Sequence, residues 1–239
     1  KGDEIAAYQP GLAPSFTHAT FTPEWQSISD PRDYVLAMAD RFRAGGGEIT
    51  ITRAERLVAG GVETAAGMMP GNVVLAAGAH SHHLARTVGA KIPLETERGY
   101  HVIFENPSQM PRNPMMITSG KFGVNPMDMG LRCAGTVELG DHRAGPSKQP
   151  IKLLKRYAAA AFPTLTYSST QEWMGFRPST PDSVPLIGEI GNSGIYTGFG
   201  HQHVGLTAGP KTGRLLAQMI DGTPPNIDMA PYAPARYLH

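Results

Sequence analysis

The segment GIYTGFGHQHVGLTAGPKTGRLLAQMI, residues 194–220, decides the fold. β-branched and aromatic residues come first, glycines follow, and a helical apolar periodicity begins at about Val204, so the pattern predicts a strand, a glycine turn and a helix. Gly198, Gly200 and Gly205 let the backbone approach a ligand closely. The start of the helix offers free N–H groups to an electron-rich group. By itself, such a turn fits a packing device as well as a ligand site.

A similar pattern occurs earlier, in NVVLAAGAHS, residues 72–81. The unbroken apolar run over 73–77 predicts a strand covered on both faces, and Gly78 leads from it into a helix predicted over 81–88. This segment alone indicates only a tight crossover.

The remaining elements follow from start, stop and alternation signals. Asp30 and Pro31 predict a helix that ends at the glycines of 45–47, and residues 48–77 contain short strand-like runs, the first being EITI at 48–51. The other predicted elements are strands at 100–105, 131–139, 171–176 and 195–197, and helices at 148–161 and 204–220.

Composition restricts the function. The 239 residues carry 21 Lys and Arg against 20 Asp and Glu, so the net charge of +1 gives no source of attraction to nucleic acid. Hydrophobic residues make up 41%, enough for a core, but no window of about 18 apolar residues predicts a membrane helix. Cys133 is the one cysteine, which excludes an internal disulfide and favours a buried thiol.

One arginine is a candidate ligand-binding residue. In GFRPSTPDSVPLIGEI, residues 175–190, three prolines stiffen the chain around Arg177. A guanidinium held on a rigid strand suits bidentate capture of a carboxylate. The alternative is an internal salt bridge with Asp182 or Glu189.

Histidines form two groups, His80, His82 and His83, and His201 and His203. Neither group has the spacing of a zinc site, so no metal site is expected. The first group fits solvated or capping roles, whereas the second lies in the glycine turn.

Five segments in this order resemble one family: VVLAAGAHS, PLETERGYHV, LRCAGTVELG, WMGFRPSTPDSVPLIG and the glycine-turn segment. Together they resemble the FAD-dependent D-amino acid oxidase and dehydrogenase superfamily, and most of all its bacterial D-amino acid dehydrogenases. The resemblance extends from about Leu12 to the end of the chain.

The resemblance implies an α/β fold, in which an incomplete Rossmann-like FAD-binding domain is interleaved with an antiparallel-sheet substrate domain. Residues 30–97 and 175–227 would form the FAD domain, 1–29 and 98–174 the substrate domain, and 228–239 a tail. The family's N-terminal G-x-G-x-x-G unit is not found in this sequence. We therefore expect poor FAD binding by the chain alone, unless another chain supplies that half or the chain associates with itself through the exposed sheet edge.

The resemblance also assigns residues. Arg177 would hold the substrate carboxylate, Tyr100 and Phe122 would line the same pocket, and His203 stands where some relatives carry a second arginine. The cofactor would contact Glu55, Ala77, Gly78, Ala79, Gly200, His201, Gln202, His203, Val204, Gly205, Leu206 and Thr207.

The implied reaction is oxidative deamination of a D-amino acid or a related amine, with hydride transfer from the substrate Cα to flavin N5. Oxygen and a membrane quinone both remain open as electron acceptors, and the expected location is cytoplasmic, with peripheral attachment to the inner membrane as an alternative. A competing hypothesis is a non-catalytic fragment or subunit of such an enzyme. A metal-dependent hydrolase built on the histidines is disfavoured by their spacing.

Overall fold

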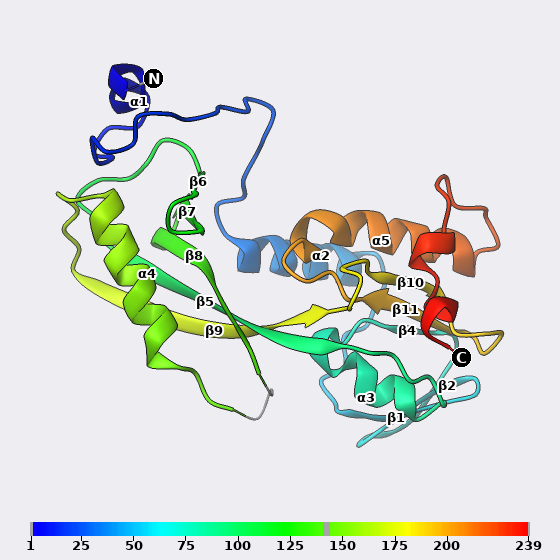
Figure 1. Ribbon diagram of the computed structural model, residues 1–239. Coiled ribbons are helices and arrows are strands. Elements are labelled where there is room, and N and C mark those ends of the chain that lie inside the picture. The colour runs from blue at the N-terminus through cyan, green and yellow to red at the C-terminus, as the bar shows by residue number, and fades with distance from the viewer. Residues whose placement is uncertain (1, 141–143, 239) are drawn as a thin grey trace. The chain divides into compact units, whose positions relative to one another are not determined.

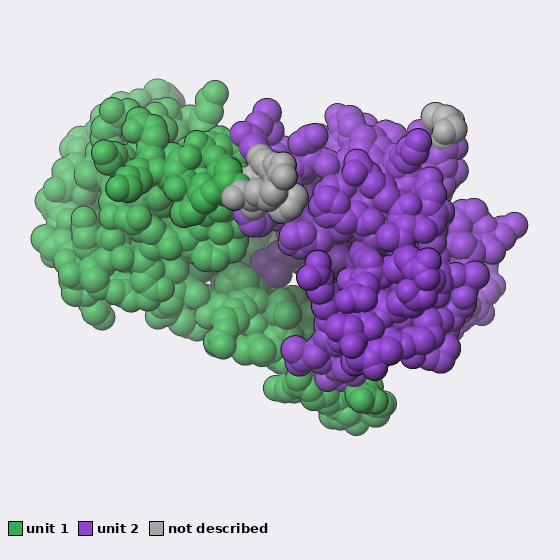
Figure 2. All heavy atoms as spheres, turned by 90° about the horizontal axis from the view of Figure 1, so that it is seen from below, with its two compact units in different colours: residues 1–48, 98–138, 143–175 green, residues 49–97, 139–142, 176–239 purple. Residues whose placement is uncertain are grey.

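The computed structural model describes residues 2–140 and 144–238. The chain divides into two compact units, which Figure 2 colours separately: unit 1 comprises residues 1–48, 98–138 and 143–175, and unit 2 comprises 49–97, 139–142 and 176–239. Each unit is therefore assembled from segments that are distant in the sequence. Residues 30–48, which we expected in the FAD domain, belong to unit 1. The assignment of cofactor and substrate to particular domains stays a prediction.

Unit 1 is built on a five-stranded sheet whose strand order is β6-β7-β8-β5-β9. Its strands are β5 (Glu95–Glu105), β6 (Met115–Ile117), β7 (Phe122–Met127), β8 (Gly130–Leu139) and β9 (Ser169–Ser179). Residues 95–97 of β5, 139 of β8 and 176–179 of β9 belong to unit 2. The β6–β7 and β7–β8 pairs are antiparallel, as expected for the middle of the sequence. The sequence-based prediction missed the short β6 and β7, and β5 and β9 are longer than predicted.

Helix α4 (Lys148–Ala161) has the bounds that the sequence predicted. Its apolar residues recur at helical spacing, and Ile151, Leu154 and Ala158 are buried in one core with the sheet residues. In Figure 1 the helix lies alongside β5 and β9. This core also contains Tyr100 and Phe122.

Cys133 lies in the same core and is fully buried. Burial raises the pKa of its thiol to about 12, so the reactive thiolate is scarce at neutral pH. We expect no reaction of the native protein with Ellman's reagent at pH 8 and release of one equivalent of chromophore per chain in denaturant. Rapid labelling of the native protein would contradict the buried position.

Unit 2 contains a three-stranded sheet of order β10-β11-β4, formed by β10 (Leu186–Glu189), β11 (Ile195–Phe199) and β4 (Val73–Leu75). β10 and β11 are antiparallel, whereas β11 and β4 are parallel. Helix α5 (Gly205–Ile220) packs on this sheet (Figure 1). It approaches closely at Gly198, where a Cβ atom would lie 2.9 Å from Leu216 Cδ1.

A single-turn 3₁₀ helix (Gly78–His80) and α3 (Ser81–Arg86) follow β4. β4 is an edge strand, and no described strand pairs with its second edge. Both faces of a parallel strand are ordinarily covered by other elements. Val74 in β4 is instead exposed.

The second sheet of unit 2 is an antiparallel meander of β1 (Ala54–Val58), β2 (Gly61–Thr64) and β3 (Gly67–Pro70). The predicted strand over 48–51 is wrong, because these residues form no strand in the structure. Ile51 is 94% exposed. The run has suitable residues for a strand, but it pairs with no strand among the described residues.

Helix α2 (Pro31–Ala44) begins as predicted: the Asp30 carboxylate accepts a hydrogen bond from the Arg32 N–H at 2.6 Å. None of its residues is buried. The exposed large apolar side chains of this helix are Tyr34, Val35, Leu36, Met38 and Phe42.

The remaining helices are α1 (Gly2–Tyr8) and two 3₁₀ turns, Ala230–Tyr232 and Pro234–Tyr237. Within the described ranges, no helix has both the length and the apolar character needed to cross a membrane.

Candidate functional site

Arg177 lies near the end of β9, in unit 2, and is half-buried. Both carboxylates that we considered as partners are engaged elsewhere: Asp182 pairs with Arg236 at 2.9 Å, and Glu189 accepts a hydrogen bond from the Gly194 N–H at 2.8 Å. Arg177 forms no hydrogen bond or ion pair with residues 2–140 or 144–238. Its guanidinium donors therefore have no partner among the described residues.

The glycine turn follows β11 and reverses the chain into α5. Gly200 has a φ of +87°, and a Cβ atom there would lie 3.0 Å from Thr180 Cγ2, so the turn requires glycine for its backbone angle and for its space. Gln202 also has a positive φ, +50°. The Val204 N–H then donates to the His201 carbonyl at 3.0 Å, which closes the turn.

The first turn of α5 presents backbone donors. Its first intrahelical bond runs from the Ala208 N–H to the Val204 carbonyl at 2.9 Å. The N–H groups of Gly205, Leu206 and Thr207 precede this bond and have no acceptor within the helix, and no side chain caps the helix. Val204 and Leu206 are exposed, so this end of the helix is accessible in unit 2.

The end of β4 lies at the same sheet edge as the end of β11, since the two strands are parallel and Leu75 is opposite Thr197. The predicted cofactor segments 77–79 and 200–207 are thus brought to one edge of one sheet. Gly78 has a φ of +56°, and a Cβ atom there would meet nothing within 4 Å. Ala77 is exposed and Ala79 is buried.

The two histidines of the glycine turn differ in environment. His201 is half-buried, its Nε2 lies 2.8 Å from Thr212 Oγ1, and burial lowers its pKa. A neutral ring is therefore favoured at neutral pH. His203 is exposed.

Tyr100 and Phe122 belong to unit 1, and each is only 1% exposed. The Tyr100 hydroxyl donates to Glu138 Oε2 at 2.5 Å, and the Phe122 ring stacks on Tyr157. Their predicted role in a substrate pocket stays a prediction.

Glu55 lies in unit 2, at a register shift of β1 between Ala54 and Arg56, and its side chain is exposed. Its contact with the cofactor also stays a prediction.

Thr212 is a residue that the sequence-based reasoning missed. It is 6% exposed and lies on the buried face of α5 with Leu215 and Leu216. A threonine at an apolar position of an amphipathic helix is a signal that could have indicated a buried hydrogen-bond partner.

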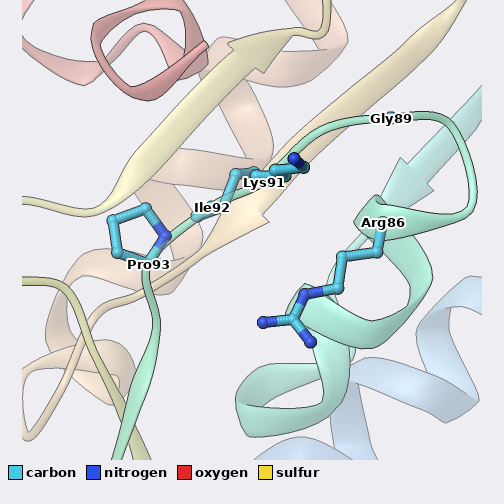
Figure 3. A pocket seen from close by; sticks show the side chains of 5 residues that line it. All are labelled: Arg86, Gly89, Lys91, Ile92 and Pro93. Carbon is cyan, nitrogen blue, oxygen red and sulfur yellow. The ribbon is translucent and has the colours of Figure 1, made fainter. Parts of the chain in front are cut away.

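Two cavities of unit 2 are lined by residues other than Arg177 and those of the glycine turn. The first has a volume of about 490 Å³ (Figure 3) and is lined by Arg86, Gly89, Lys91, Ile92 and Pro93. The second shares Arg86, Ile92 and Pro93 with the first and extends to His82 and Gly140. Within the part of the chain that the structure describes, no cluster of three or more His, Cys, Asp or Glu side chains is placed to hold a metal ion.

Comparison with known proteins identifies the family. The model of the family described as "DAO: FAD dependent oxidoreductase" matches residues 1–219. The D-amino-acid oxidase of Bradyrhizobium diazoefficiens is 39% identical over 247 residues, covering 99% of this chain and 59% of that protein. The glycine oxidase of Pseudomonas putida is 30% identical, covering 97% of this chain and 66% of that protein. The chain thus spans about three-fifths to two-thirds of the length of these relatives.

Solved structures agree on the fold. The glycine oxidase from Geobacillus kaustophilus superposes with a TM-score of 0.88 at 23% identity, covering 100% of this chain and 66% of that one. The L-proline dehydrogenase from P. horikoshii gives 0.80 at 19% identity, covering 99% and 67%. The mixed α/β architecture expected from the sequence is therefore confirmed, and the chain belongs to the DAO family of FAD-dependent oxidoreductases.

Proposed function

We propose that this chain supplies the carboxylate-binding arginine and the flavin-binding turn of an enzyme that oxidatively deaminates a D-amino acid or a related amine such as glycine. The observation that carries the proposal is the half-buried residue Arg177, whose guanidinium has no partner among the described residues. A buried or half-buried charge ordinarily has a partner. A substrate carboxylate is the partner that the planar guanidinium fits best.

The donors at the start of α5 suit a flavin. The N–H groups of Gly205, Leu206 and Thr207 have no intrahelical acceptor, and the open space at Gly78 leaves room for a bound group at the same sheet edge. Bound FAD would supply the acceptor for the hydride that leaves the substrate Cα. The protein would contribute N–H donors and a helix dipole, which stabilise negative charge at the pyrimidine edge of the flavin.

Arg177 would contribute by orientation. A bidentate hydrogen bond to the substrate carboxylate removes rotational freedom and holds the Cα hydrogen in one direction. The amine would remain neutral and donate its electron pair as the hydride departs, so no side-chain base is needed in this proposal. The two relatives are named for D-amino acids and for glycine, both of which carry a carboxylate and an amine on one carbon. His203 stands where some relatives carry a second arginine, so the choice among such substrates stays open.

The proposal is tested by the visible absorption spectrum of the purified chain, recorded before and after addition of FAD and removal of the excess. Poor FAD binding is expected of the chain alone, so bound-flavin bands would indicate self-association, and we expect such bands to bleach without oxygen when a D-amino acid or glycine is added. Bands that persist with every amino acid would contradict the proposed reaction. A protein that stays colourless would contradict FAD binding by this chain alone.

The colourless result would favour the second candidate function, a non-catalytic fragment or subunit that holds FAD only together with another polypeptide. The unpaired edge of β4 and the exposed Ile51 favour this alternative. Its test is to add, as a separate polypeptide, the part of the Bradyrhizobium oxidase that has no counterpart in this chain. Flavin bands that appear only in the mixture would support it.

Changing Arg177 to lysine tests the carboxylate assignment. Lysine keeps the charge but cannot form the bidentate hydrogen bond to a carboxylate. We therefore expect KM for the amino acid to rise about 10-fold to 50-fold with a smaller change in kcat. The measurement is anaerobic flavin reduction at varied substrate concentration. Arg214→Lys on the exposed side of α5 is the matched control and should change neither constant. An unaltered KM in Arg177→Lys would remove Arg177 from the substrate site.

A further inference from the structure

The glycine turn is attached by its backbone to the strand that carries Arg177. The Gln202 N–H donates to the Pro178 carbonyl at 3.1 Å, and His201 forms an antiparallel bridge with Ser179. Pro178 and Ser179 directly follow Arg177. The turn and the end of β9 are therefore in a fixed register within unit 2.

A side-chain contact attaches the same turn to the body of α5. His201 Nε2 lies 2.8 Å from the hydroxyl of Thr212, which is 6% exposed. A buried hydroxyl without a hydrogen bond is costly, and His201 is the side chain that satisfies this one. The Cβ atom of His201 also lies close to the start of the helix, because a Cβ atom on Gly205 would lie 3.4 Å from it.

We propose that Thr212 is a positioning residue, which acts through His201 to hold the glycine turn, and with it the backbone donors of 205–207, at a fixed distance from Arg177. The turn has two attachments, one to the β9 backbone and one to α5, and only the second depends on a side chain. Thr212 itself touches neither ligand in this proposal. Its importance for catalysis rests on the proposed function, whereas its effect on the turn does not.

The experiment compares Thr212→Val, which keeps the shape and removes the hydroxyl, with Thr212→Ser, which restores it. In Thr212→Val we expect amide hydrogen exchange at Gln202 and Val204 to quicken about tenfold, since one net hydrogen bond is lost. The nitrogen chemical shifts of the His201 ring should change as well. Thr212→Ser should return both signals to those of the parent chain.

Thr197→Val is the matched control. Thr197 is fully buried and donates to the Gly188 carbonyl at 3.0 Å in the same sheet, so this variant also loses one buried hydroxyl bond. It should leave exchange at Gln202 and Val204 unchanged. Equal acceleration in both valine variants, or none in Thr212→Val, would overturn the proposal.

Two further measurements test the proposal, the first on the unaltered chain without flavin and the second on Thr212→Val with flavin. In the unaltered chain, the nitrogen chemical shifts of the His201 ring should differ from those of the exposed His203 ring, because Nε2 of His201 is engaged by Thr212; identical shifts for the two rings would overturn the proposal. With FAD bound, Thr212→Val should raise both the Kd for FAD and KM, each about threefold or more. If exchange responds as expected but no flavin binds, the proposed function fails and the positioning role stands. If flavin binds and bleaches while exchange is unaffected, the positioning role alone fails.

Discussion

Gly135→Ala is expected to lower the free energy of unfolding by about 3 kcal/mol, because strand β8 has no room for a methyl group at this position. A Cβ atom on Gly135 would lie 2.5 Å from both the Lys121 carbonyl oxygen and Phe122 Cα. Both are backbone atoms, and they belong to the segment beside β8: Phe122 begins β7, which pairs with β8. Relief of the clash therefore requires the two paired strands to separate or shift.

Gly123→Ala is the matched control on the neighbouring strand. A Cβ atom there would meet the Ala134 carbonyl oxygen at 3.6 Å and Asn125 Nδ2 at 3.7 Å, which are ordinary contacts. The expected change in unfolding free energy is within about 1 kcal/mol, since alanine also restricts the unfolded chain. Urea denaturation followed by circular dichroism measures both variants. Equal midpoints would show that the sheet accommodates the methyl group at Gly135, contrary to the expected clash.

The sequence predicted best the elements whose signals are local. α2 begins at an aspartate cap followed by proline, and α4 has an apolar stripe, so both helices were located from consecutive residues alone. The run at 48–51 shows the limit of this reasoning. Its composition is that of a strand, but a strand also requires a partner, and the described residues provide none.

In the candidate site, too, features with local sequence signals could be predicted, whereas contacts between distant residues could not. Arg177 and the glycine turn could be predicted as site residues because the signals that point to them lie in consecutive residues. The hydrogen bond between His201 and Thr212 spans 11 positions, and that between Tyr100 and Glu138 spans 38. Such contacts depend on how the strands and helices pack, and neither pair has a spacing that a sequence pattern would reveal.

The second large effect is expected for Glu138→Gln, which removes a charge beside a buried arginine. The Arg98 side chain is 9% exposed, and its Nη2 lies 2.7 Å from Glu138 Oε2, which also accepts the hydrogen bond from the Tyr100 hydroxyl. Glutamine keeps the shape and an acceptor for Tyr100 but leaves the guanidinium without its counter-charge. Arg98 retains hydrogen bonds to the Ala144 and Gly145 carbonyls. Because the Glu138 side chain is 30% exposed, we expect a loss of about 2 kcal/mol of unfolding free energy, below that for a fully buried pair.

The pH dependence identifies the cause of this loss. The Tyr100 hydroxyl above all, with Ser147 and Arg98, holds the pKa of the Glu138 carboxyl below its ordinary 4.5. A carboxyl whose pKa is lowered by folding stabilises the protein above its unfolded pKa, and this contribution is lost as the pH falls through the folded value. The difference between the parent chain and Glu138→Gln should accordingly be full at pH 7 and shrink below about pH 4.5. Glu63→Gln, in the exposed pair with Arg56, is the control and should not measurably change the urea midpoint. A difference that stays constant down to pH 3 would mean that the loss comes from altered packing and not from the missing charge.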